Sequence, residues 1–185
     1  TTGWDSPIWS KIDEVTADQT DFAASDDFTS VPEFLVPTGT LSNDFAVTGA
    51  GTAHEATDEM ATHEGASNSD TDYISSSTLN HKVRFSFNTP SQVPDDNQTG
   101  RLYVNVWRRG AGTSGSATLT VRILDNGTVK ATSFVSVPIS GSYSLTTRLA
   151  PVGANNFTNL QNLEVEFEIT AISGDLVVRV SACDL

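Results

Sequence analysis

The chain is poor in cysteine, methionine and basic residues: among 185 residues it has one cysteine (Cys183), one methionine and ten Lys or Arg. A single cysteine excludes a disulfide framework within the chain. Because Cys183 lies in an alternating, strand-like segment, we expect it to be a small buried hydrophobe. No run approaches the roughly 18 consecutive apolar residues of a membrane-spanning helix, and the chain does not open with a basic segment followed by an apolar one. We therefore expect no membrane partner.

Acidic side chains dominate the charge, with 23 Asp and Glu giving a net charge of −13. Affinity for nucleic acid comes largely from Lys and Arg, so DNA and RNA are not expected partners. The acidity is concentrated: residues 1–75 hold 15 acids and one base, Lys11, whereas residues 76–185 hold 8 acids and 9 bases. A charged partner of the N-terminal region should be basic, or a cation.

Alternation of apolar and polar residues predicts strands through the second half of the chain. The clearest example is 163–169, where Leu163, Val165, Phe167 and Ile169 alternate with glutamates. Asn126-Gly127 between two alternating runs is a strong hairpin signal. The predicted strands are 73–76, 82–87, 102–106, 117–124, 129–137, 143–149, 163–169 and 176–182.

About eight short strands without intervening helical patterns predict an all-β fold, specifically an antiparallel β-sandwich of jelly-roll type. Long helices are not expected. The predicted core consists of the inward-facing residues Val83, Phe85, Val104, Val106, Leu119, Val121, Ile123, Val165, Phe167, Val178 and Val180.

The N-terminal part has a different character, and we divide the chain into an irregular acidic arm or extension over 1–53 and a jelly-roll domain over 54–185. Ser6 and Pro7 could begin a short helix, and brief strands are predicted at 34–36 and 45–47. An arm this polar cannot bury enough apolar area to order itself alone. We expect it to fold onto a neighbour, anchored by Trp4, Ile8, Trp9 and Ile12.

The segment Gly110 to Gly115 has the G-x-G-x-x-G spacing of a dinucleotide-binding loop. That motif requires a helix immediately afterwards, whose N-terminus holds the pyrophosphate. Here a strand pattern follows, so we interpret the glycines as a flexible hairpin loop.

Metal and catalytic motifs are also weak. His54 and His63 stand nine residues apart, which does not place both on one face of a short helix. The segment 68–72 imitates the opening of a calcium loop, but Tyr73 and Leu79 occupy the positions that require Gly and Glu. No Gly-x-Ser-x-Gly elbow is present. We therefore expect no metal, no cofactor and no enzymatic activity.

Several short motifs resemble a family of structural proteins of tailed and marine bacteriophages, of the jelly-roll cement or decoration type. The resemblance covers most of 54–185 and, less closely, 8–23, whereas 26–53 departs from the pattern. Its motifs are Trp9-x-x-Ile12-Asp13-Glu14, Asp18-x-x-Asp21-Phe22, Asp70-Thr71-Asp72-Tyr73-Ile74 and the closing segments 157–165 and 176–180. The resemblance implies a structural role in the virion, with a tail or fibre component as a variant.

Two functions compete for the same residues. Tyr103, Asn105 and Trp107 should share one sheet face, which is either a ligand platform or a buried subunit contact. A carbohydrate- or receptor-binding module would use such aromatics, with Tyr143 also available. The acidic arm instead favours docking onto a basic shell.

We therefore expect a cement protein on the outer capsid surface, bound to the major capsid protein or neighbouring virion subunits. We also expect a homo-oligomer, for which a trimer is the form that such families often take.

Overall fold

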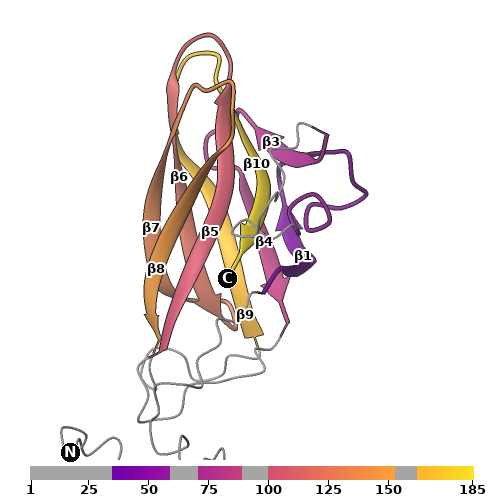
Figure 1. Cartoon of the computed structure of the whole chain (residues 1–185), viewed down its shortest axis with the longest axis vertical. Coiled ribbons are helices and arrows are strands. Elements are labelled where there is room, and N and C mark those ends of the chain that lie inside the picture. The colour runs from indigo at the N-terminus through magenta and orange to yellow at the C-terminus, as the bar shows by residue number, and fades with distance from the viewer. Residues whose placement is uncertain (1–34, 59–70, 89–99, 153–161) are drawn as a thin grey trace, which may run out of the picture. The chain divides into compact units, whose positions relative to one another are not determined.

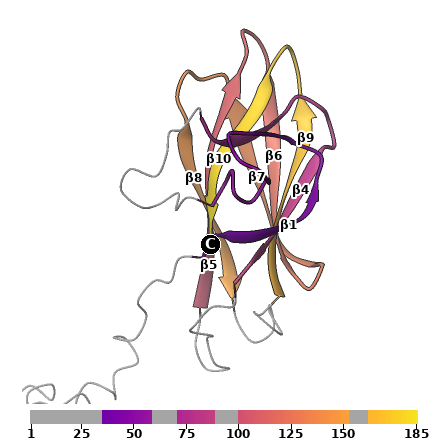
Figure 2. The same cartoon turned by 90° about the vertical axis from the view of Figure 1, so that its right-hand side faces the viewer.

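The computed structural model describes residues 35–58, 71–88, 100–152 and 162–185, which form ten β-strands in two five-stranded antiparallel sheets (Figures 1 and 2). No α-helix occurs among these residues, and none of their elements is a helix that could cross a membrane. The first sheet has the order β1 (Pro37–Asn43), β4 (Lys82–Phe87), β9 (Leu163–Ile172), β6 (Ser116–Asp125) and β7 (Thr128–Pro138). The second has the order β2 (Ala46–Thr48), β3 (Tyr73–Ser76), β10 (Val177–Asp184), β5 (Gly100–Ala111) and β8 (Ser144–Val152).

The strand pairing is that of one long antiparallel ribbon folded into two sheets. The hairpin β6–β7 lies at its centre, and β5 pairs with β8, β4 with β9 and β3 with β10. The pairs β6–β7 and β4–β9 lie in the first sheet, and the pairs β5–β8 and β3–β10 lie in the second. This alternation between sheets is the jelly-roll arrangement. The predicted jelly-roll sandwich is thus confirmed. The predicted hairpin turn is present as well, because Asn126 and Gly127 both have positive φ, at 48° and 76°, as a type I′ turn requires.

Strands β1 and β2 add one edge strand to each sheet, by pairing with β4 and β3. Both lie inside the range 1–53 that the sequence assigns to an arm, so residues 37–48 are part of the sandwich. The strand predicted at 34–36 ends just before β1 begins, whereas the one predicted at 45–47 overlaps β2 at two residues. The reason is local: β1 reads Pro-Thr-Gly-Thr-Leu-Ser-Asn, with no apolar alternation to mark it. The proposed anchors Trp4, Ile8, Trp9 and Ile12 lie outside the described residues.

Residues near the start of the described chain also complete the edge of β10. Because β3 has only four residues, it covers β10 only at Val178, Arg179 and Val180. Further along, Leu35 and Leu185 exchange two backbone hydrogen bonds, each 2.9 Å long, and the Cys183 N–H donates to the Thr57 carbonyl at 3.0 Å.

Strand β5 continues through Arg108 and Arg109, beyond the end at residue 106 that the sequence predicts. Arg108 can remain in the strand because its guanidinium finds backbone acceptors in both sheets. It donates to the carbonyl of Ser136 on β7 at 3.0 Å and to that of Ser144 on β8 at 2.8 Å. Arg108 therefore ties together the two strands that end the sheets on this side.

The core lies between the sheets, and every residue of the predicted core is buried. Phe85 of β4 and Phe167 of β9 meet edge to face, with ring centroids 5.9 Å apart at 74°. This is a favourable arrangement of aromatic quadrupoles. Cys183 is buried as expected, and burial, assisted by the neighbouring Asp184, raises the pKa of its thiol.

The glycine-rich segment joins β5 to β6, with no helix after it, as the sequence analysis expected. Gly112 and Gly115 have φ of +147° and +110°, values that L side chains rarely adopt. A Cβ at Gly115 would lie 1.9 Å from the carbonyl oxygen of Ser173. The glycines therefore permit the β5–β6 loop to lie against the turn between β9 and β10.

Candidate functional site

The outer face of the second sheet brings together the residues that best resemble a binding surface. Val104 and Val106 of β5 point into the core, so alternation turns Trp107 and Arg109 outward. Register places Trp107 between Ala182 of β10 and Leu145 of β8. Trp107 is half-buried and Leu145 is 40% exposed. Ala182 itself is fully buried. We call Trp107, Leu145, Arg109 and Arg179 the binding face.

Two arginines occupy the next position along this face. Arg179 of β10 lies directly opposite Arg109 of β5 in the register. The guanidinium of Arg179 stands over the ring of Tyr73, 4.5 Å from its centroid, and that of Arg109 stands over the ring of Tyr143 at 5.1 Å. We call these four side chains the arginine row. Both distances are within the range of cation–π attraction.

A backbone contact fixes Arg109 further, because its Nη1 donates to the carbonyl of Gly141 at 3.0 Å. Gly141 lies in the connection between β7 and β8, which also supplies Tyr143. The connection runs beside β5, where Ser140 N–H donates to the Gly110 carbonyl at 3.0 Å. The conformation of this connection thus orients one half of the arginine row.

Asn105, which the sequence placed on the same platform, is withdrawn from the surface. Its Nδ2 donates to the Asp184 carboxylate at 2.5 Å, and the two residues are 4% and 0% exposed. The register puts Tyr103 opposite Leu149, on the same side as Trp107, while its side chain falls outside the part that the structure describes. Of the predicted face, Trp107 is therefore the aromatic residue that the structure places at the surface.

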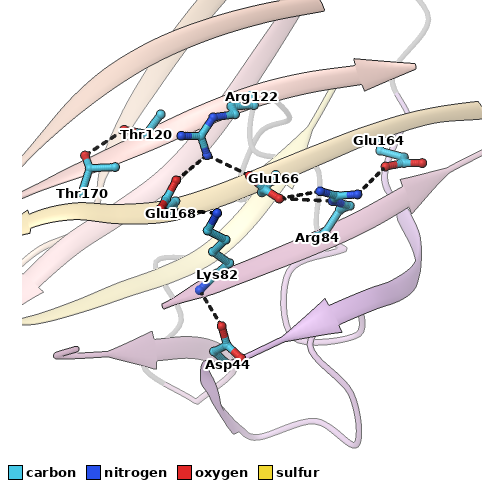
Figure 3. Close-up of polar contacts among 9 residues, drawn as sticks. All are labelled: Asp44, Lys82, Arg84, Thr120, Arg122, Glu164, Glu166, Glu168 and Thr170. Atoms are coloured by element: carbon cyan, nitrogen blue, oxygen red, sulfur yellow. Dashed lines mark hydrogen bonds and ion pairs between the residues drawn. The ribbon is translucent and has the colours of Figure 1, made fainter. Parts of the chain in front are cut away.

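The outer face of the first sheet carries a second polar array, drawn in Figure 3. Here β9 presents Glu164, Glu166 and Glu168 between bases from β4 and β6. Glu166 Oε2 accepts from Arg84 and Glu166 Oε1 from Arg122, each at 2.8 Å.

The remaining ion pairs extend the same array across three strands. Arg122 also contacts Glu168 at 2.6 Å, Lys82 contacts Glu168 at 3.5 Å and Arg84 contacts Glu164 at 3.5 Å. Three bases thus face three acids. We interpret this ladder as a structural network whose charges balance.

The pKa values on the ladder follow from this pairing. Burial raises the pKa of Glu166, but hydrogen bonds from Arg84 and Arg122 outweigh it, so the net pKa lies below the ordinary 4.5. For Arg122, burial lowers the pKa, while bonds to Glu168 and Glu166 outweigh this and raise the pKa above its ordinary value. Both groups are held in their charged forms.

Among the candidate metal ligands, the described ones do not form a site. His54 Nδ1 is hydrogen-bonded to the hydroxyls of Thr40 and Thr52, at 3.1 and 2.9 Å. Burial, together with the charges of Asp58 and Glu55, raises the pKa of Asp72. No group of three or more His, Cys, Asp or Glu with metal-binding geometry occurs among the residues described. The second histidine of the candidate pair, His63, lies outside them.

Ser76 and His81 are a serine and a histidine in contact, with 2.9 Å between Oγ and Nδ1. The sequence analysis did not identify this pair. Ser76 is nevertheless 8% exposed, and its Oγ also accepts from the N–H of Thr78 at 3.1 Å. These bonds close the turn between β3 and β4, and we assign the pair a structural role.

The sequence analysis missed the arginine row because it depends on pairing across the sheet. Arg179 stands in the pattern Val178-Arg179-Val180, which marks it as outward-facing. No local pattern shows that β10 lies between β3 and β5, and that position is what brings Arg179 to Tyr73 and Arg109.

Comparisons with known proteins leave the chain without an assigned family: no protein-family model matches it, and no curated protein matches it. Among solved structures it is similar to CBM35 from Cellvibrio japonicus Abf62, at 14% identity and a TM-score of 0.42, covering 83% of this chain and 96% of that one. It is also similar to Xyl-CBM35 in complex with a glucuronic acid containing disaccharide, at 14% identity and a TM-score of 0.41, covering 79% and 91%. At these values, the fold assignment rests on the strand order itself.

Proposed function

We propose that the chain is a non-catalytic module that binds carbohydrate on the outer face of its second sheet. The observation that carries the proposal is the position of Trp107, beside the apolar Leu145 and next to the oriented guanidinium of Arg109. A sugar ring offers an apolar C–H face and a rim of hydroxyls. An indole and a fixed donor side by side suit both parts.

Binding to a panel of soluble polysaccharides, measured by affinity electrophoresis and calorimetry, tests this proposal. Trp107→Ala should abolish or strongly weaken binding to the best polymer while leaving the unfolding midpoint near that of the unmodified protein. Phe134→Ala is the matched control, because Phe134 is 66% exposed on β7, in the other sheet. Binding that is equally sensitive to both substitutions, or absent for every polymer, would contradict the proposal.

A structural role on a phage capsid is the second candidate. What favours it is the motif resemblance together with the concentration of 15 acids in residues 1–75, which suits docking onto a basic shell. Attachment to the major capsid protein or a neighbouring subunit, location on the virion and a trimeric state all stay predictions. Imaging of purified particles should show regular spacing over the capsid, lost when residues 1–30 are deleted. Particles that lack the protein, or an unchanged attachment after the deletion, would exclude this role.

A further inference from the structure

The tip of the β6–β7 hairpin carries a chemically labile pair of residues. Asn126-Gly127 is the one Asn-Gly step in the sequence, and both of its residues are exposed. Asparagine is a thermolabile residue, because the backbone nitrogen that follows it can attack its side-chain amide. Glycine in the next position hinders this attack least, since it has no Cβ. A Cβ added at Gly127 would meet nothing within 4 Å, so the tip has room to change conformation.

The folded turn keeps the two reacting atoms apart. Asn126 has a φ of 48°, in the left-handed region, where the following nitrogen points away from the side chain. Closing a ring between them requires rotation about the Cα–C bond of Asn126, and this rotation breaks the type I′ turn. Two contacts oppose it: Asp125 pairs with Thr128 across the turn, and the Asn126 N–H donates to the Asn162 carbonyl at 3.1 Å. The reaction therefore has to pass through an opened turn.

An opening of this kind needs to involve only the tip of the hairpin. Thr128 and Val129 are exposed, and a register shift between Ile123 and Leu124 makes the pairing irregular beside the turn. Turns and strand ends open at a lower free energy than the centre of a sheet. Leu124 is 1% exposed, so the opening should stop there. We expect the tip to open while the sandwich stays folded.

We propose that Asn126 is a site of spontaneous deamidation, reached when the turn opens, and that the isoaspartate formed there prevents the turn from closing again. The Gly127 nitrogen loses its proton to solvent base and bonds to Asn126 Cγ. The Cγ–Nδ2 bond breaks, and Nδ2 leaves as ammonia with a proton returned by the solvent. Water then adds to one carbonyl of the cyclic imide and breaks its bond to the Gly127 nitrogen. Addition at the main-chain carbonyl of residue 126 gives isoaspartate, and addition at Cγ gives aspartate.

Isoaspartate alters the backbone, whereas aspartate does not. The main chain then runs through Cβ and Cγ of residue 126 and is one carbon atom longer. A two-residue hairpin turn depends on the dihedral angles of both its residues, and the longer link cannot adopt them. The change should therefore loosen the tip of β6–β7, the hairpin at the centre of the folded ribbon. The binding face lies on the other sheet, so this inference is independent of carbohydrate binding.

Tryptic digestion isolates the site for measurement. Cleavage after Arg122 and Lys130 releases the peptide 123–130, in which Asn126 is the one asparagine. The protein is incubated in mildly alkaline buffer, either folded or unfolded in urea, and then digested. A sample digested at the start corrects for deamidation during digestion. Synthetic peptides with aspartate or isoaspartate at position 126 identify the products by chromatography and mass.

The same digest contains a matched internal control. Cleavage after Arg101 and Arg108 releases the peptide 102–108, in which Asn105 is 4% exposed and precedes Val106. In folded protein, the peptide 123–130 should convert and the peptide 102–108 should stay unmodified. Conversion at Asn126 should be about tenfold or more slower in folded protein than in urea, because only molecules with an opened turn react.

The effect on the backbone needs a control for charge. Deamidation adds a negative charge, and freshly prepared Asn126→Asp carries this charge on an ordinary backbone, in an Asp-Gly pair that also suits a type I′ turn. Incubated protein rich in isoaspartate should have a lower urea midpoint than Asn126→Asp. Asn126→Gly forms a Gly-Gly turn without a side-chain amide, so its urea midpoint should not change during the incubation.

Each contrary result overturns a stated part of the proposal. If the peptide 123–130 stays unmodified in folded protein while it converts in urea, Asn126 is not a modification site of the folded chain. Equal rates with and without urea would show that the turn does not control the reaction. Conversion of Asn105 at the same rate would remove the assignment to the turn. Isoaspartate-containing protein as stable as Asn126→Asp would contradict the effect on the hairpin.

Discussion

Asp175 in the β9–β10 turn accepts two hydrogen bonds from Ser114 in the β5–β6 loop, one from its backbone N–H at 2.6 Å and one from its hydroxyl at 2.8 Å. Thr113 adds its own N–H at 3.0 Å and its hydroxyl at 2.7 Å. Both connections pass from one sheet to the other at the same end of the sandwich (Figure 1). Asp175 thus links the β9–β10 turn to the β5–β6 loop, next to Gly115.

The first prediction concerns the pH dependence of this contact. Hydrogen bonds from Thr113 and Ser114 lower the pKa of Asp175 well below its ordinary 3.8. A lowered pKa means that the contribution to stability is present above the unfolded-state pKa and is lost as the pH falls through the folded-state pKa. Asp175→Asn should therefore lower the urea midpoint at about pH 7, with a difference that shrinks below about pH 4. Equilibrium unfolding at several pH values measures this, and a difference independent of pH would contradict it.

Gly115 gives a second prediction for the same loop. Gly115→Ala would place a Cβ against the Ser173 carbonyl at a φ of +110°, and should cost more than about 1 kcal/mol of unfolding free energy. Gly141→Ala is the control, because a Cβ there meets nothing within 4 Å. It should be neutral or slightly stabilising. Thermal unfolding of the two variants decides the matter, and equal midpoints would refute the argument.

Much of the sandwich follows from sequence because its strands carry a period-two pattern. Leu163, Val165 and Phe167 alternate with glutamates, and Asn126-Gly127 marks a turn of the kind that the structure has. Strand β1 lacks such a pattern, and its place beside β4 depends on long-range pairing. The same limit applies to the site. Trp107 could be placed on an outward face, whereas its neighbours on β8 and β10 are set by the order of the sheet.

The third prediction addresses the charged ladder on the first sheet. Glu166→Gln removes the carboxylate that both Arg84 and Arg122 contact at 2.8 Å, and Glu166 is 6% exposed. It should lower the unfolding free energy by roughly 1.5–3 kcal/mol, the range for hydrogen bonds to charged groups. Glu164→Gln is the control, because that carboxylate has a longer contact of 3.5 Å with Arg84. Its effect should be under about 1 kcal/mol. If denaturant titrations gave the two variants the same stability, the central role of Glu166 would be wrong.

The fourth prediction tests the core contact between Phe85 and Phe167, which lie on neighbouring strands of the first sheet. Phe85 is fully buried and meets Phe167 edge to face, so Phe85→Ala leaves a cavity and removes the aromatic pair. Substitutions of this kind cost about 3–5 kcal/mol, a large part of the 5–15 kcal/mol or so that stabilises a typical domain. Phe134→Ala deletes the same atoms from a side chain that is 66% exposed and should change stability by about 0.5 kcal/mol or less. Denaturant unfolding of both variants supplies the comparison. A Phe85→Ala protein as stable as Phe134→Ala would mean that β4 and β9 do not pack as described.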